Sequence, residues 1–78
     1  MKARIYVTLK PDVLDPQGKA VFHSLQELGY DEVADVRIGR YLEVELEGSP
    51  EAAQKRLDEM CRRLLANPVT EEFKVEIS

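Results

Sequence analysis

Few residues of this chain are suited to covalent chemistry. Its 78 residues include one cysteine, Cys61, and one histidine, His23. A catalytic thiol needs a base and an orienting group beside it. Cys61 falls on the apolar stripe of one expected helix, whereas His23 falls on the polar side of another. We therefore expect Cys61 to be a small buried hydrophobe and His23 to be solvated, which leaves no nucleophile–base pair.

The carboxylates are more numerous, and Glu43, Glu45 and Glu47 alternate along one expected strand. Such a row resembles a metal site, but hard cations prefer oxygens that converge from several elements. A solvated strand face is therefore the favoured interpretation. One Cys and one His do not make a zinc cluster, and no Gly-rich turn that would cradle a phosphate is present. We expect this chain to hold no catalytic residue, no metal and no cofactor of its own.

Tyr6 and Tyr41 fall on the expected open face of the sheet, where RNA-recognition domains stack bases. The neighbouring glutamates would repel phosphates, and the chain carries a net charge of −4. A nucleic-acid binder typically carries a basic patch. The sequence therefore disfavours a nucleic-acid partner.

Alternating apolar and polar residues predict four strands, over 3–9, 33–38, 41–47 and 69–77. Gly39-Arg40 lies between the second and third of these and suits a tight hairpin turn.

Helical spacing predicts two helices, over 16–28 and 50–66. Each begins with a capping residue followed by proline, Asp15-Pro16 and Ser49-Pro50, because proline needs no N–H partner at the first helical position. Gly29 closes the first helix.

The resulting order is βαββαβ, the ferredoxin-like arrangement. We expect an α+β fold with two helices on one face of an antiparallel sheet, in a single domain over residues 1–78. A domain this small is marginally stable, and a lone cysteine provides no internal disulfide, so oligomerisation is the expected remedy. The chain has no apolar run of membrane-spanning length and no signal-peptide block. The lone cysteine fits the cytoplasm.

Three segments contain more distinctive residues than helix caps and turns alone require, and we call them the specified segments. They are "LKPDVLDPQG" early, "VRIGRYLEVEL" in the middle and "CRRLLANPVTEEFKVEI" late. Together they resemble the PurS family, and the likeness covers essentially the whole chain. The strings "VLDPQG" and "LLANPV", in this order and spacing, are the most specific part of it.

The resemblance implies a non-catalytic small subunit of formylglycinamidine ribonucleotide (FGAM) synthase, an ATP-dependent glutamine amidotransferase ligase (EC 6.3.5.3) of purine biosynthesis. In that family a large PurL subunit binds ribonucleotide and ATP, and a PurQ subunit releases ammonia from glutamine. PurS homodimers bridge the two and assist ammonia transfer. ATP and Mg belong to the complex, so whether this chain counts as an enzyme depends on its partners. The sequence leaves open whether dimers pair into tetramers.

Loops and element ends are where binding residues concentrate. The sequence therefore predicts a partner interface at Lys10, Asp15, Gln17, Arg37, Asn67 and Glu71. An alternative function stays open at this point, a ferredoxin-like ACT-type regulatory domain that binds a small molecule near Gly29 or Gly39.

Overall fold

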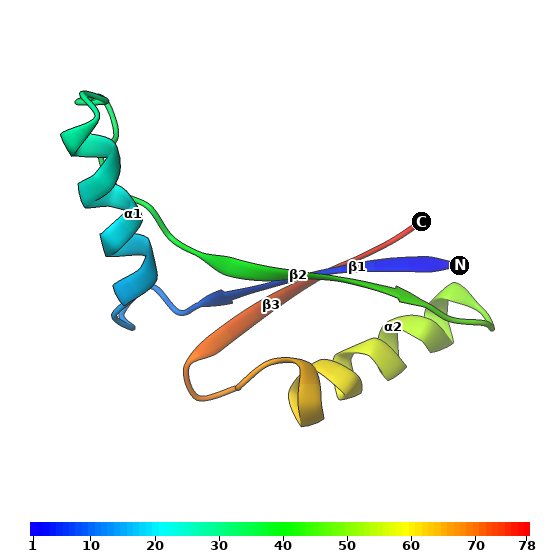
Figure 1. The fold of residues 1–78 in the computed structure, drawn as a ribbon. Coiled ribbons are helices and arrows are strands. Elements are labelled where there is room, and N and C mark those ends of the chain that lie inside the picture. Colours follow the sequence, from blue (N-terminus) through cyan, green and yellow to red (C-terminus); the bar gives the residue numbers. More distant parts are fainter.

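The computed structural model describes residues 1–78 as a three-stranded antiparallel sheet, a helix packed beneath it and a second helix that stands apart (Figure 1). The strand order is β2-β1-β3. The predicted α+β class, with an antiparallel sheet and two helices, is confirmed. In chain order the elements are β1 (Lys2–Leu9), α1 (Pro16–Glu27), β2 (Gly39–Glu45), α2 (Pro50–Met60), the π-helical turn η1 (Cys61–Leu65) and β3 (Glu71–Ile77).

The core lies between the lower face of the sheet and α2, and we call this packed unit the body (β1, β2, α2, η1 and β3). Period-two alternation places every second side chain of β1 on that face, and Leu57 from α2 packs against them. The fully buried side chains of the core are Ala3, Ile5, Val7, Leu57 and Cys61. The body thus has a small but continuous apolar core.

Both helices begin as predicted, with proline at the first helical position. Asp15 and Ser49 cap them by accepting hydrogen bonds from backbone N–H groups three residues ahead. After α1, Gly29 adopts φ +95° and its N–H donates to the carbonyl of Gln26, while the Tyr30 N–H donates to that of Leu25. This pair of bonds is a Schellman motif, which glycine favours because it carries no Cβ.

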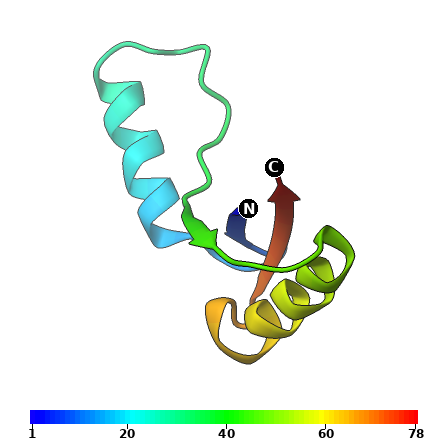
Figure 2. The same cartoon turned by 90° about the vertical axis from the view of Figure 1, so that its right-hand side faces the viewer.

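The strand predicted over 33–38 is not formed, and Gly39-Arg40 is not a hairpin turn. β2 begins at Gly39, which pairs with Thr8 of β1. Residues 33–38 instead run back beside α1 toward the sheet (Figure 2). The central strand β1 already has β2 and β3 as its two neighbours, so this segment has no place beside it. The ferredoxin-like order therefore lacks its second strand in this protomer.

α1 does not lie on the sheet face that α2 covers. Together with the returning segment it forms a projection from one end of the sheet, which we call the arm (residues 14–38; Figure 1). The radius of gyration is 15.8 Å, whereas a compact domain of this length would have ~11–12 Å. The chain by itself is therefore not compact, and the arm is the cause.

Candidate functional site

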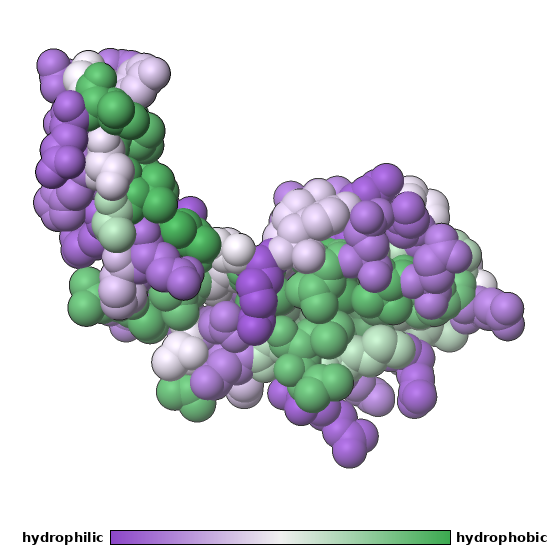
Figure 3. Space-filling model, viewed as in Figure 1, coloured by the Kyte–Doolittle hydropathy of each residue, from purple (hydrophilic) through white to green (hydrophobic).

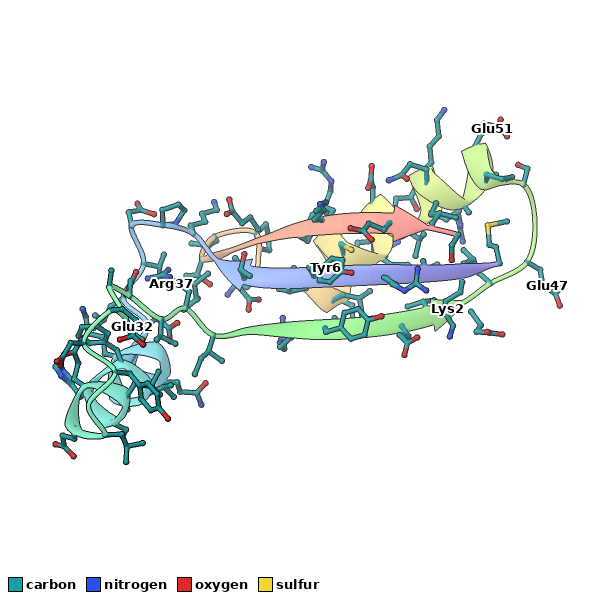
Figure 4. The ribbon with its side chains drawn as sticks, turned by 90° about the horizontal axis from the view of Figure 1, so that it is seen from above. Lys2, Tyr6, Glu32, Arg37, Glu47 and Glu51 are labelled. Atoms are coloured by element: carbon teal, nitrogen blue, oxygen red, sulfur yellow. The ribbon has the colours of Figure 1, made fainter.

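The arm joins the body at one end of the sheet, and all three specified segments of the sequence meet there. We call this junction the arm base (residues 10–18, 36–40 and 65–71). Figure 4 shows the sheet from above, with Arg37 between the arm and the strands. The arm base is held by side chains that bond to backbone groups of distant segments. These contacts fix where the arm points.

Asp15 ties the start of α1 to the returning segment of the arm. It is only 4% exposed. One carboxylate oxygen accepts from the Gly18 N–H at 2.9 Å, and the other accepts from the Ile38 N–H at 2.7 Å. The hydrogen bond from Ile38, followed by that from Gly18, lowers the pKa of Asp15 below its ordinary value. A helix cap has thus become a bridge between two segments twenty-three residues apart.

Gly18 leaves room for this bridge. A Cβ at position 18 would meet the carbonyl oxygen of Val36 and would lie 2.6 Å from the second carboxylate oxygen of Asp15. The glycine of "VLDPQG" is therefore required by close packing of α1 on the returning segment, since its backbone is ordinary helix.

Arg37 closes the loop that precedes α1. Its guanidinium donates to the carbonyl oxygen of Lys10 at 2.9 Å and to that of Val13 at 3.1 Å. The guanidinium carries donors in a rigid planar fork, so it can hold two carbonyls at once. Arg37 thus ties the returning segment to the end of β1.

A second set of bonds ties the arm base to the turn after η1. The Lys10 ammonium donates to the Pro68 carbonyl at 2.9 Å. Arg40 donates both to the Leu65 carbonyl and to the Glu71 carboxylate, at 2.8 and 2.9 Å. The same Glu71 oxygen accepts from the Asn67 N–H at 2.8 Å. Residues from three separate segments therefore share one polar network.

The structure brings five of the six predicted interface residues into these networks: Lys10, Asp15, Arg37, Asn67 and Glu71. Gln17 makes no side-chain hydrogen bond but lines a hollow of about 230 Å³ beside Asp15, Arg40 and Glu71. Sequence reasoning did not select Arg40 as a site residue, although the "VRIGR" string contained it. Its two hydrogen bonds to the late segment could not be predicted from the spacing of residues near Arg40.

The groups with chemical potential lie elsewhere and apart. Cys61 is fully buried in the core, as predicted, and burial raises the pKa of its thiol. His23 is exposed on α1, also as predicted. No cluster of three or more His, Cys, Asp or Glu side chains is placed to hold a metal ion. None of the helices has both the length and the apolar character needed to cross a bilayer.

The upper face of the sheet is uncovered, with Tyr6 at its centre (Figure 4). The Tyr6 and Tyr41 rings lie with their centroids 5.3 Å apart. Glu43 sits beside them and forms an ion pair with Lys2 at 3.0 Å. The hydrogen bond between the Lys2 ammonium and the Glu43 carboxylate, together with the charge of that carboxylate, raises the pKa of Lys2. This face is mixed in charge, as the alternation indicated.

Comparison with known proteins gives a consistent result over the whole chain. The family model PurS, phosphoribosylformylglycinamidine (FGAM) synthase, matches residues 2–78. The PurS subunit of Synechocystis is 58% identical over 76 residues, which are 96% of this chain and 76% of that protein. The PurS subunit of Bacillus subtilis is 49% identical and is covered to 90%, with 97% of this chain aligned.

Solved structures agree. The B. subtilis PurS structure superposes with a TM-score of 0.90 at 48% identity and covers 99% of this chain and 96% of that chain. A structure of PurLQS from Thermotoga maritima contains a chain that superposes with a TM-score of 0.81 at 36% identity, over 96% of this chain and 93% of that one. The matches give the ACT-type reading no support. The chain belongs to the PurS family, the small subunit of FGAM synthase in purine biosynthesis.

Proposed function

We propose that this chain, acting as a single domain over residues 1–78, bridges the PurL synthetase and the PurQ glutaminase without contributing catalytic groups. The match to a chain of the T. maritima PurLQS structure is the observation that carries this proposal. The buried Cys61 and the exposed, distant His23 are consistent with it.

The protein acts as an oligomer in this proposal, and the arm provides the reason. Hydrophobic atoms run along the arm on the side toward the sheet (Figure 3). Val21 and Leu28 are 40% and 73% exposed, and α1 buries only Gly18. An apolar helix face of this kind needs a partner. The partner in this proposal is a second copy of the chain, whose own α1 has the same exposed apolar face. The two copies form the homodimer.

Five of the six interface residues of the arm base, all except Gln17, then have a positioning role. The side chains of Asp15 and Arg37 form hydrogen bonds within the chain itself. They fix the arm for its partner, whereas Gln17 is exposed, makes no side-chain hydrogen bond and can contact that partner directly. Charge reversal at Arg37 is expected to weaken assembly while the body stays folded.

The ATP and Mg²⁺ that the synthase reaction requires bind to the large subunit in this proposal, and the complex works in the cytoplasm. Ammonia released from glutamine must reach the synthetase without escaping to bulk water. A bridging subunit assists by excluding water and by ordering its partners.

Activity reconstitution tests the proposal. Purified large subunit and glutaminase are assayed with glutamine or with ammonia, in the presence and absence of this chain. We expect glutamine-dependent turnover to require the chain and ammonia-dependent turnover to persist without it. Equal glutamine-dependent rates with and without the chain would overturn the bridging role.

A further inference from the structure

The outer edge of β2 is open. Met1 and Leu46 exchange two hydrogen bonds, at 3.0 and 3.1 Å, and such pairs recur at every second residue of an antiparallel ladder. The even-numbered residues of β2 therefore bond to β1, whereas Glu43 and Glu45 direct their backbone N–H and C=O groups outward. No strand lies on that side. An open edge of this kind is a template for a further strand.

The returning segment of the arm has an open edge that matches it. The N–H of Ile38 donates to Asp15, and that of Val36 donates to the carboxylate beside it. The N–H groups of Asp35 and Arg37 make no hydrogen bond. One side of this segment is therefore used within the arm, while the alternate residues keep free backbone donors. The strand that the alternation predicts here lacks only a neighbour.

The lower face of the sheet is also incompletely covered. Leu42, Val44 and Leu46 of β2 point to this face but are only half-buried, whereas the apolar residues of β1 are fully buried. In the ferredoxin-like order the first helix lies on the same face as the second. The place beneath β2 is thus vacant, while α1 leaves Val21 and Leu28 exposed.

The arm does not reach these two places on its own body. Asp15 and Arg37 tie the returning segment to the start of α1 and to the chain before it. That segment ends at Ile38, and Gly39 already pairs with β1. A Cβ at Gly39 would lie 2.5 Å from the Val7 carbonyl oxygen, so the chain enters β2 close against β1. Because a hairpin needs at least a two-residue turn, the segment has no length left to reverse beside β2.

A second copy does reach them. The returning segment and β2 meet at a bend (Figure 1). A two-fold axis that bisects this bend lays the β2 of a second copy antiparallel to the returning segment of the first, and the reverse. The same rotation turns the lower face of the second sheet toward the first arm. Hydrophobic atoms line the side of the arm that meets it (Figure 3).

We propose that two copies of the chain swap arms. Each returning segment becomes the fourth strand of the partner's sheet, outside β2, and each α1 packs beneath that sheet beside α2. This inference rests on the proposed homodimer and names the surface that receives the arm. Swapping an identical element is a low-cost route to a dimer, since the displaced element and the vacant place belong to the same sequence.

Hydrogen exchange in the wild-type dimer tests the strand pairing. We expect the Glu43 and Glu45 amides to be as protected as those of Leu42 and Val44, which bond to β1. In Leu28→Asp, at concentrations where it is monomeric, the two outward amides should exchange about ten-fold faster or more, while the even-numbered amides stay protected. A wild-type dimer with unprotected Glu43 and Glu45 amides would overturn the swap and leave the homodimer standing.

A longer connection tests the cause of the swap. Gly-Ser-Gly inserted between Ile38 and Gly39 supplies the missing turn, so the arm should close on its own sheet. We expect this variant to sediment as a monomer in which the odd-numbered amides of β2 stay protected. The same insertion between Glu47 and Gly48, in the exposed loop before α2, is the matched control and should remain a dimer.

A hinge variant that dimerises as tightly as the control would overturn the swap. A monomer whose odd-numbered β2 amides are unprotected would also do so, because the arm then has no place on this sheet. If the wild-type chain is itself monomeric at all concentrations, the proposed homodimer fails, which is a separate result.

Discussion

The body and the arm obey the same local rules but differ in how those rules are satisfied. Both contain a helix with a polar cap, an initial proline and an apolar stripe. In the body that stripe packs on the sheet and buries Ala53 and Leu57, whereas on the arm Val21 and Leu28 stay exposed. Amphipathic helices gain most of their stability from packing rather than propensity. The body therefore packs its own helix, whereas the arm is held in place by polar bonds and leaves its apolar stripe exposed.

Removing the core side chain of α2 should have the largest effect on the body. Leu57 is fully buried, so Leu57→Ala should lower the free energy of unfolding by about 2–5 kcal/mol through lost burial and the cavity that remains. Urea denaturation followed by circular dichroism measures it. Leu64→Ala, at a position 83% exposed, should change it by less than about 0.5 kcal/mol. Similar losses in both variants would show that the body is not the stable unit.

Weakening the arm base should have a smaller and local effect. In Gly18→Ala the new Cβ meets the Val36 carbonyl and the Asp15 carboxylate, so the returning segment must shift, at a cost of about 1–3 kcal/mol. Hydrogen exchange should show faster exchange at the Ile38 amide, which donates to Asp15, and unchanged exchange in β1. Gln17→Ala, at the exposed neighbouring position, is the control. Uniform acceleration in both regions would mean that arm and body unfold together.

Local rules predicted the parts of this molecule that depend on near neighbours. Pro16 and Pro50, with their caps, placed both helix starts correctly, and alternation placed β1 and the acidic outer face of β2. The segment 33–38 was misassigned because alternation reports extended backbone without saying whether a partner strand is available. Sheet membership is a long-range property, and here β1 has two other neighbours.

The candidate site shows the same division. Its residues were found because loops and element ends concentrate function, yet their hydrogen bonds could not be predicted. Asp15 was recognised as a cap, but its second bond to Ile38 crosses twenty-three positions. Arg40 gave no local signal at all, because its partners Leu65 and Glu71 lie in another segment. The predicted contact with a partner subunit remains a prediction for all six residues.

Charging the apolar stripe of the arm separates assembly from folding. Leu28 is 73% exposed in the single chain, so Leu28→Asp should leave unfolding of the body nearly unchanged. The proposed homodimer buries that side chain, and burial of a leucine is worth about 1.5–3 kcal/mol, so association should weaken about ten-fold or more. Sedimentation velocity over a concentration series measures it. His23→Asp places a carboxylate on the opposite side of α1 and should leave association intact; an equal loss there would point to general repulsion.

The smallest expected effect is the pH dependence of the arm base, and it follows from Asp15. Hydrogen bonds from Ile38 and Gly18 lower the pKa of this carboxyl in the folded chain, while in the unfolded chain it has the ordinary value of about 3.9. The stability that the charged carboxylate contributes is therefore complete well above that value and is lost as the pH falls from it toward the lowered pKa.

Asp15→Asn keeps the shape of the side chain but cannot ionise. Thermal unfolding of both proteins from neutral pH to about pH 3 should show a gap in midpoint temperature that narrows only at the acid end. Every other carboxylate titrates in both proteins, so a gap of constant size would mean that the Asp15 bridge to Ile38 does not hold the arm through its charge.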